Sequence, residues 1–216
     1  MRSILVMNSK GGCGKTTLAT NLAGYYAARG KSVALVDYDP QESSIDWLEA
    51  RGGDRAPIVG IAASQDAVRI PKNMDYVIMD SPAAVHGRPL AELVRKADII
   101  LMPVLPSPID VRAARNFLNE VNKLRKVVNA DVKFATVANR VRENTVAAHD
   151  LYEYLDALRL PNGKKLPYLA VLRASQNYIR AAEKGLSIFE FAPVKTLPDR
   201  DQWVRIFRWI NSVGKR

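Results

Sequence analysis

A glycine-rich loop, set between an apolar run and a helical pattern, constrains the fold of this chain more than any other feature. The loop reads KGGCGKTT from Lys10 to Thr17. It follows the run SILVM at residues 3–7, which is typical of a buried strand, and it opens a helical stretch at residues 15–29. Glycines let backbone N–H groups turn inward around phosphate oxygens, and a helix N-terminus adds the positive end of its dipole. The sequence therefore predicts a strand, a phosphate-binding loop and a helix in that order.

The side chains of this loop have distinct expected partners on a Mg²⁺–nucleoside triphosphate. Lys15 is placed to reach the β- and γ-phosphates, and the Thr16 hydroxyl is placed to bind Mg²⁺. Thr17 and the helix after it are expected to contact the α-phosphate. Because Cys13 is the only cysteine of the chain, a disulfide framework and a CxxC metal site are excluded. The loop backbone around the phosphates is expected to come from Gly11, Gly12, Cys13 and Gly14.

Apolar runs alternate with helical patterns along all 216 residues. Short, nearly continuous apolar runs are typical of strands covered on both faces, and their alternation with helices indicates a mostly parallel sheet. A chain of this length suits one domain. We therefore predict a single α/β domain over residues 1–216, a P-loop NTPase whose twisted sheet has helices on both faces, with no helix-turn-helix domain before it. The expected strands are 3–7, 32–37, 75–80, 98–104, 132–138 and 166–172, and the expected helices are 15–29, 88–96, 108–128, 144–158 and 174–184.

Three carboxylates stand at the ends of two of these strands. Asp37 and Asp39 close the run LVDYD, where the alternation of side chains points both toward the phosphate loop. Asp80 closes the run DYVIMD, and a carboxylate at the tip of such a strand holds Mg²⁺, usually through water. Because ligands of parallel sheets bind at the carboxyl ends of the strands, these residues are expected beside the loop.

Together these motifs resemble the ParA/MinD family of ATPases, whose deviant Walker A motif carries a lysine at the position of Lys10. The resemblance covers residues 1–213 and implies roles for individual side chains. Lys10 would cross to the nucleotide of a partner subunit and act in catalysis, so that two ATP molecules are sandwiched between two protomers. Within the matching DYDPQ motif, Asp39 would position or activate the attacking water, and Asp37 would support Mg²⁺ through water.

The resemblance also gives roles to Asn139 and Arg140, which close the run FATVANR. Family members often end this strand with such a pair. Asn139 would contact the adenine, because an amide has both a donor and an acceptor for the edge of the base. Arg140 would stack on the base or brace the partner subunit. The cofactors that the resemblance implies are ATP and Mg²⁺.

An excess of positive charge indicates a polyanionic partner, since the formal net charge is +10. Residues 111–142 hold eight Lys or Arg against two Asp or Glu, and residues 173–216 hold nine against four. Long cationic side chains suit sequence-independent binding to DNA phosphates. The residues expected to contact DNA are Arg173, Arg180, Lys184, Arg200, Arg205 and Arg208.

The last segment, RDQWVRIFRWINSVGKR, leaves a second interpretation open. Trp203, Phe207 and Ile210 fall on one stripe of a helix, and basic residues lie elsewhere on it. Such a helix either packs on the sheet or lies on an anionic membrane, as in MinD-like regulators of cell-division site placement. We favour packing, because little length remains beyond the fold. A metabolic ligase of the same fold is a weaker third possibility, since the sequence shows no motif for a small-molecule acceptor.

The resemblance to small ParA-type members implies a cytoplasmic, nucleoid-associated ATPase that positions a cargo. ATP would assemble a homodimer that binds DNA without sequence preference. A ParB-like or cargo-adaptor protein would stimulate the slow intrinsic hydrolysis to ADP and phosphate, and would thereby release the dimer. The cargo would be a plasmid, a chromosome or a protein assembly, and a membrane partner is not expected.

Overall fold

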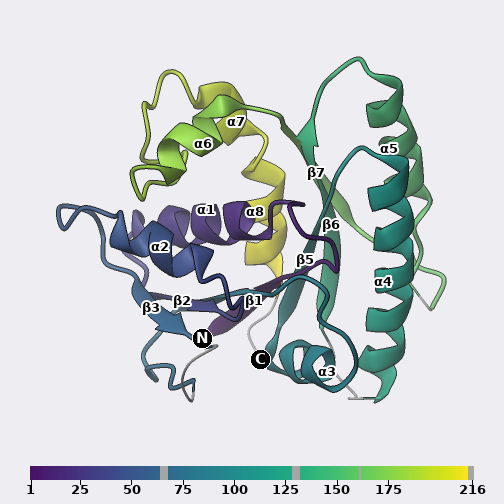
Figure 1. Ribbon diagram of the computed structural model, residues 1–216, viewed down its shortest axis with the longest axis horizontal. Coiled ribbons are helices and arrows are strands. Elements are labelled where there is room, and N and C mark those ends of the chain that lie inside the picture. The colour runs from purple at the N-terminus through teal and green to yellow at the C-terminus, as the bar shows by residue number, and fades with distance from the viewer. Residues whose placement is uncertain (64–67, 128–131, 161, 214–216) are drawn as a thin grey trace.

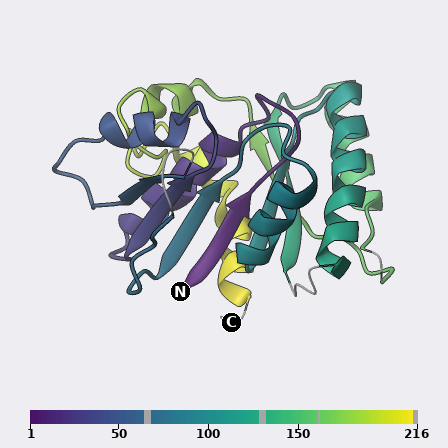
Figure 2. The same ribbon diagram turned by 60° about the horizontal axis from the view of Figure 1, so that its bottom comes forward.

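The computed structural model describes residues 1–63, 68–127, 132–160 and 162–213, which form a seven-stranded sheet covered by helices (Figures 1 and 2). The strands are β1 (Arg2–Val6), β2 (Val33–Asp37), β3 (Val59–Ala62), β4 (Tyr76–Asp80), β5 (Ile99–Val104), β6 (Lys133–Val141) and β7 (Tyr168–Arg173). Their order in the sheet is β3-β2-β4-β1-β5-β6-β7, and every pair is parallel. The prediction of a parallel α/β sheet is confirmed.

Helices cover both faces of the sheet (Figure 1). One face is covered by α3 (Gly87–Lys96), α4 (Pro108–Val127) and α5 (Val146–Ala157), whose apolar residues are buried against the strands. The other face is covered by α1 (Lys15–Ala27), α2 (Ser43–Glu49), α6 (Gln176–Ala182) and α8 (Val204–Ser212). The short α7 (Leu197–Asp201) lies beside α6.

The strand order positions the phosphate loop. β1 lies between β4 and β5, and the chain runs outward from β1 to β2 and β3, returns to β4 and then crosses to β5. A crevice forms at such a reversal, outside the carboxyl ends of the strands, and ligands of open α/β sheets bind there. The loop at residues 7–14 follows β1 and therefore begins at this crevice.

The sequence did not predict β3, α2 or α7. β3 is an edge strand whose residues are exposed or half-buried, so it lacks the continuous apolar run of the central strands. The two helices have only seven and five residues, too few to show a helical period. β6 extends to Val141, beyond the predicted end at residue 138. The predicted helix end at residue 128 lies outside the described residues.

The C-terminal helix α8 is part of the core. Trp203, Ile206 and Ile210 are completely buried, and the ring of Phe207 stacks on Tyr25 of α1. The apolar stripe is therefore already covered by protein and is not available to a membrane surface. No helix in the part of the chain that the structure describes has the length and apolar character needed to cross a bilayer.

Candidate nucleotide-binding site

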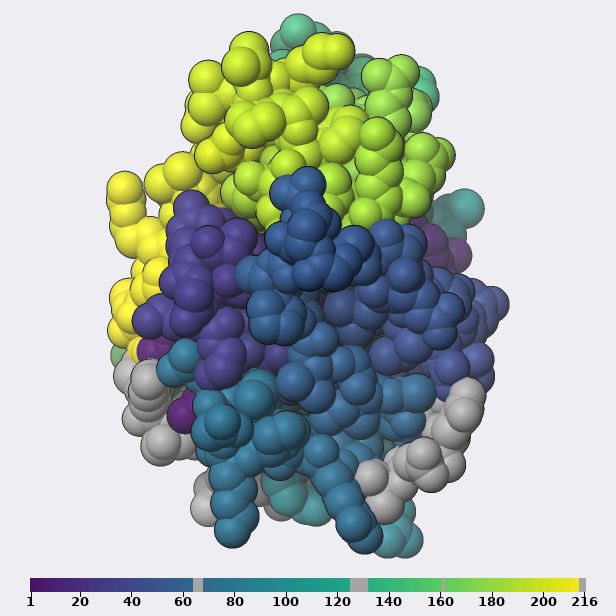
Figure 3. Space-filling view, turned by 90° about the vertical axis from the view of Figure 1, so that its left-hand side faces the viewer, coloured from purple at the N-terminus to yellow at the C-terminus, as the bar shows by residue number. Residues whose placement is uncertain are grey.

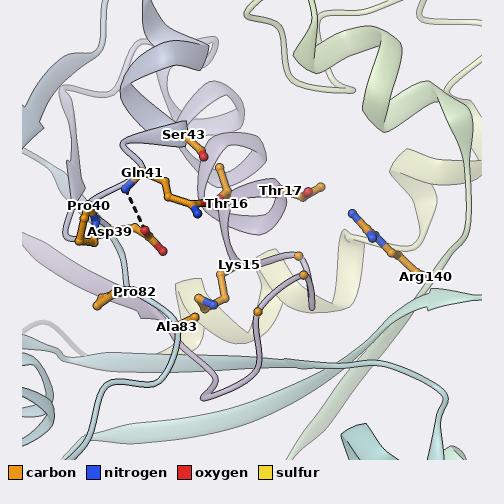
Figure 4. Close-up of a pocket in the computed structure, with 13 residues that line it drawn as sticks. Lys15, Thr16, Thr17, Asp39, Pro40, Gln41, Ser43, Pro82, Ala83 and Arg140 are labelled. Atoms are coloured by element: carbon orange, nitrogen blue, oxygen red, sulfur yellow. Dashed lines mark hydrogen bonds between the residues drawn. The ribbon is translucent and has the colours of Figure 1, made fainter.

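The loop between β1 and α1 forms one wall of an open cavity of about 360 Å³ (Figure 4). α1 begins at Lys15, so the N–H groups of its first turn have no partner within the helix and are available to an anion. Figure 4 shows Asp39 and Gln41 on one side of the loop and Arg140 on the other. The cavity is lined by Gly11, Gly12, Gly14, Lys15, Thr16, Thr17, Asp39, Pro40, Gln41, Ser43, Pro82, Ala83 and Arg140.

Glycine is required at position 14 for two reasons. The backbone there is left-handed, with φ at +94°, and a Cβ atom would lie 2.1 Å from Nδ2 of Asn139. This Nδ2 donates a hydrogen bond to the Cys13 carbonyl at 2.8 Å, and Asn139 is only 4% exposed. Asn139 therefore braces the phosphate loop from β6, a role that the sequence did not reveal. Its contact with the adenine stays a prediction.

The two lysines of the loop have different environments. Lys15 is 7% exposed, and its Nζ donates to the Lys10 carbonyl at 3.1 Å, which holds the ammonium over the loop. Within the described residues, the Lys10 ammonium has neither a hydrogen bond nor an ion pair, and Lys10 does not line the cavity. The Cys13 thiol also donates to the Lys10 carbonyl, and burial raises the pKa of that thiol. Within the described residues, Lys15 is thus held at the loop, whereas the Lys10 ammonium has no partner.

Asp37 and Asp80 lie side by side beneath the cavity, paired in register between β2 and β4, and both are buried. The Asp37 carboxylate accepts hydrogen bonds from the backbone N–H groups of Asp39 and Ser44, at 2.9 and 2.7 Å. Burial raises the pKa of Asp37 in spite of these bonds. Asp37 thus shapes the turn after β2 and, like Asp80, is not among the residues that line the cavity. Its support of Mg²⁺ through water stays a prediction.

Asp80 and Thr16 offer donors that fit Mg²⁺. Oδ2 of Asp80 accepts a hydrogen bond from the Ser44 hydroxyl at 2.6 Å, whereas its buried Oδ1 has no hydrogen-bond partner among the described residues. Burial raises the pKa of Asp80 to about 7, although the Ser44 and Thr16 hydroxyls act in the opposite direction. A cation beside Oδ1 would give this oxygen a partner and keep the carboxylate ionised. The orphaned oxygen therefore supports the predicted metal site.

Ser44 is a site residue that the sequence did not reveal. It is completely buried in the first turn of α2, and it bonds both carboxylates, Asp37 through its N–H and Asp80 through its hydroxyl. We expect Ser44→Ala to lower the free energy of unfolding by about 1–3 kcal/mol at pH 8, because a buried ionised acceptor loses its donor. The loss should be smaller at pH 5, below the Asp80 pKa of about 7, where the carboxyl is protonated and uncharged.

Urea unfolding without nucleotide at the two pH values measures this effect. Ser3→Ala is the matched control, because the Ser3 hydroxyl donates to Asp98 at 2.9 Å and Ser3 lies near the opposite end of β1 from the phosphate loop. The difference between pH 8 and pH 5 should be larger for Ser44→Ala than for Ser3→Ala. Equal differences would contradict the role assigned to the Ser44 hydroxyl.

Asp39 is the acidic residue that lines the cavity. One of its oxygens accepts the Gln41 N–H at 3.0 Å, which fixes the carboxylate in the turn, and Figure 4 shows it lying toward Lys15. The other oxygen has no hydrogen bond within the described residues and is available to a water molecule in the cavity. This placement suits the predicted action on the attacking water, which stays a prediction.

A second cavity, of about 580 Å³, adjoins the first, since Thr17 and Arg140 line both. It lies where β6, β7 and α6 meet, and its walls also include Asn139, Tyr178 and Ile179. Polar groups beside apolar side chains suit a nucleoside next to its phosphates. This cavity is therefore the candidate base site, in agreement with the region that Asn139 and Arg140 predicted.

The six predicted DNA contacts do not share one environment. Arg173 lines the second cavity, and its Nε donates to the buried Asp199 at 2.6 Å, so this arginine is committed within the protomer. Arg200 is half-buried in α7. Part of each basic window, residues 128–131 and 214–216, lies outside the described residues. The exposed candidates are Arg180, Lys184, Arg205 and Arg208.

Three residues other than glycine have a left-handed backbone around the two cavities. Glu42, Ala84 and Arg140 have φ values of 51°, 54° and 51°. Glu42 and Ala84 lie in the loops after β2 and β4, and Arg140 lies near the end of β6. Each such residue costs roughly 1–2 kcal/mol. Backbone strain is thus concentrated where the chain approaches the site.

Comparison with known proteins identifies relatives over most of the chain. The family described as CobQ/CobB/MinD/ParA nucleotide binding domain matches residues 4–188. The maintenance of carboxysome distribution protein A of Halothiobacillus neapolitanus is 30% identical over 195 residues, which cover 87% of each chain. The protein of the same name from Gloeobacter kilaueensis is 33% identical over 195 residues, covering 88% of this chain and 85% of that relative.

Solved structures share the fold at low sequence identity. A putative plasmid partition protein from Borrelia burgdorferi, bound to AMPPNP, has a TM-score of 0.73 at 14% identity and covers 96% of this chain and 99% of its own. Cobyrinic acid a,c-diamide synthase from Mycobacterium smegmatis, with bound ADP and magnesium, has a TM-score of 0.65 at 19% identity, covering 94% and 97%.

The family match spans most of the chain, and relatives at 30% identity or more cover most of its length. The solved structures add the same P-loop NTPase architecture. The resemblance inferred from the sequence motifs is therefore confirmed: this chain belongs to the CobQ/CobB/MinD/ParA family of nucleotide-binding domains.

Proposed function

We propose that this protein is a ParA-type ATPase that positions a cargo, such as a plasmid, a chromosome or a protein assembly, with ATP and Mg²⁺ as cofactors. Two relatives are named for carboxysome distribution, and a protein with this fold is a putative plasmid partition protein bound to AMPPNP. Another holds ADP and magnesium. These names and ligands agree with the predicted cofactors and with the predicted class of function.

The observation that carries this proposal is the different use of the two loop lysines. Lys15 is held over its own phosphate loop, whereas the Lys10 ammonium is uncommitted within the described part of the protomer. A lysine supplied by a second protomer would stabilise charge on the transferred phosphoryl group, as an arginine finger does. Hydrolysis would then depend on a homodimer with ATP between its subunits.

The remaining residues have roles that follow from their positions. Backbone N–H groups from Gly11 to Thr16 would bind the phosphates, and Lys15 would neutralise their charge. Asp39 would hold the attacking water by its free carboxylate oxygen. Mg²⁺, held by Thr16 and through water by Asp80, would offset phosphate charge when bound. Intrinsic hydrolysis to ADP and phosphate would be slow, since Lys10 acts only in the dimer.

DNA and an activating protein are the proposed partners. Exposed cations on α8 and around α6 suit sequence-independent contacts with DNA phosphates, and such contacts would make the protein nucleoid-associated within the cytoplasm. A ParB-like or cargo-adaptor protein would stimulate hydrolysis and release the dimer. The alternative of a membrane-associated division regulator has no support in α8, because the apolar residues of this helix are buried.

Binding to random-sequence duplex DNA across a salt series tests the proposal. We expect tight binding with ATP and Mg²⁺, weak binding with ADP, and an affinity that falls steeply as salt rises. The double variant Arg180→Glu/Lys184→Glu should weaken binding and reduce the salt slope by about 2, since each lost phosphate contact removes about 0.9. Arg88→Glu/Arg95→Glu makes the same charge change at exposed positions of α3 and should bind nearly as wild type. Absence of ATP-dependent DNA binding, with the ATP dimer shown to form, would contradict the proposal and direct the next experiment to liposomes.

A further inference from the structure

The C-terminal end of α2 is tied to a buried part of the C-terminal region. The Arg51 guanidinium donates to the Gly185 carbonyl at 3.0 Å and to both carboxylate oxygens of Glu190, at 2.6 and 3.1 Å. The two side chains are only 5% and 7% exposed. Burial alone would raise the pKa of Glu190, but Arg51 and the groups of Ser187 lower it below its usual value. The pair is therefore ionised and shielded from water. A buried bidentate ion pair is stable only in a narrow range of geometries, so it holds its two segments in a fixed relative position.

Two further contacts join α2 and the residues after it to residues 185 and 186. Nε1 of Trp47, on α2, donates to the Leu186 carbonyl at 3.3 Å. Gly185 has φ at +62°, and a Cβ atom there would lie 2.3 Å from the backbone nitrogen of Arg51, so the two backbones touch. Figure 3 shows the yellow-green surface of the C-terminal region resting directly on the blue segment that contains α2. We call the hydrogen bonds of Trp47 and Arg51 to residues 185–190 the α2 clasp.

The other end of α2 is fixed at the phosphate cavity. Ser44, in its first turn, bonds Asp37 and Asp80. Ser43 lines the cavity, as does Asp39 in the preceding turn. α2 has seven residues and is thus about 10 Å long at 1.5 Å per residue. Because a helix of two turns is stiff, a shift of the turn at residues 38–44 must either move residues 185–190 or break the clasp.

Residues 185–190 lead directly to cationic surface. Lys184 precedes this segment, and Arg180 lies on α6 just before it; both are exposed. α6 is joined to α7 by Asn177, whose Nδ2 donates to the Lys195 carbonyl and to Asp199. A displacement at residues 185–190 would therefore be passed to α6 and α7 together.

The geometry points to Arg51 and Glu190 as positioning residues: through the α2 clasp, they couple the turn at residues 38–44 to the cations around α6. Binding of ATP at the phosphate cavity biases that turn, and the clasp carries the change to the DNA-binding surface. This inference rests on the proposed function, in which ATP controls affinity for DNA. It adds the physical connection between the two sites, which lies outside both of them.

The test uses Arg51→Lys, which keeps the charge but loses the bidentate fork, and Glu190→Gln, which keeps the size and a hydrogen-bond acceptor. DNA affinity is measured for each with AMPPNP and Mg²⁺ and with ADP and Mg²⁺. We expect wild type to show an AMPPNP:ADP affinity ratio in the range of about 5–150 that is typical of coupled sites. Both variants should bring this ratio close to 1 while their nucleotide affinities stay near that of wild type.

A second measurement separates coupling from loss of stability. Hydrogen exchange at residues 177–191 should differ between the AMPPNP and ADP states of wild type, and this difference should vanish in both variants. Leu155→Ala is the control, because it creates a cavity under α5 on the opposite face of the sheet. It should lower stability yet keep both the affinity ratio and the exchange difference. If Arg51→Lys or Glu190→Gln does not fold, Trp47→Phe removes the bond to Leu186 and keeps an aromatic ring beside the Arg51 guanidinium, and it should reduce the ratio in part.

The outcomes distinguish this inference from the proposed function. Unchanged ratios and unchanged exchange differences in the clasp variants would overturn the clasp while leaving ATP-dependent DNA binding intact. If wild type shows no nucleotide-dependent DNA binding, the proposed function fails. The hydrogen-exchange measurement then still tests whether the α2 clasp couples the phosphate cavity to residues 177–191. An exchange difference that the variants lose would uphold the coupling, and its absence in wild type would overturn it.

Discussion

Replacing Lys15 with alanine is expected to abolish measurable binding of ATP. The Lys15 ammonium is buried over the phosphate loop, where its charge meets the phosphates away from bulk water. Truncating one member of a buried charge pair costs about 2–5 kcal/mol, which corresponds to a loss in affinity of roughly 30-fold to several thousand-fold. Titration of a fluorescent ATP analogue with Mg²⁺ measures the effect, and circular dichroism checks that the variant is folded.

Lys10→Ala is the matched control, because it removes the other lysine of the same loop. Its ammonium has no partner within the described part of the protomer, so this variant should bind ATP as a monomer with nearly wild-type affinity. It should fail to form the ATP dimer and should lose hydrolysis. Retained micromolar affinity in Lys15→Ala would refute the phosphate-loop assignment, and normal dimerisation of Lys10→Ala would refute the action of Lys10 on a partner's nucleotide.

The second large effect is expected for Asp39→Ala, which should bind ATP and hold it unhydrolysed. Asp39 lines the cavity and, within the described residues, has a carboxylate oxygen free for water, whereas the phosphates are held by other groups. Loss of a group that acts on the proton of an attacking water lowers turnover by about 10²–10⁴-fold. Phosphate release under single-turnover conditions gives the rate, and light scattering after gel filtration should show an accumulated ATP-bound dimer.

Asp46→Ala is the control for this variant. Asp46 is exposed on α2, a few residues beyond Asp39, and does not line the cavity. Its replacement should leave turnover near the wild-type rate. Wild-type turnover in Asp39→Ala would show that Asp39 does not act in the reaction. If the variant dimer dissociates while ATP is still bound, arrested hydrolysis is not sufficient to make the dimer accumulate.

The sheet and the phosphate loop are predictable because they depend on short-range patterns. Continuous apolar runs mark strands buried on both faces, and the loop motif lies between a strand and a helix in the sequence itself. Parallel strands present ligand residues at their carboxyl ends, and this rule is enough to place Asp39 and Asp80 beside the loop from the sequence alone.

The rest depends on contacts between segments far apart in the sequence. Ser44 bonds Asp80, and Arg51 bonds Glu190, at sequence separations of 36 and 139 residues. No local pattern marks a serine or an arginine for such a partner. The Arg173–Asp199 pair is hidden for the same reason, so the sequence does not show that Arg173 is already ion-paired, and its contact with DNA stays a prediction. The sequence also does not show that the backbone N–H groups of Asp39 and Ser44 bond the Asp37 carboxylate beside Asp80.

The left-handed residues Glu42, Ala84 and Arg140 set the stability of this protein against the rigidity of the chain around the candidate nucleotide site. Glycine adopts a left-handed backbone freely, and asparagine does so more readily than most residues, so selection for a higher melting temperature alone would favour them at these three positions. The same changes would free the chain around the nucleotide to sample other shapes. A lineage that moved to a hotter habitat would therefore gain stability more safely in the outer helices than at this rim.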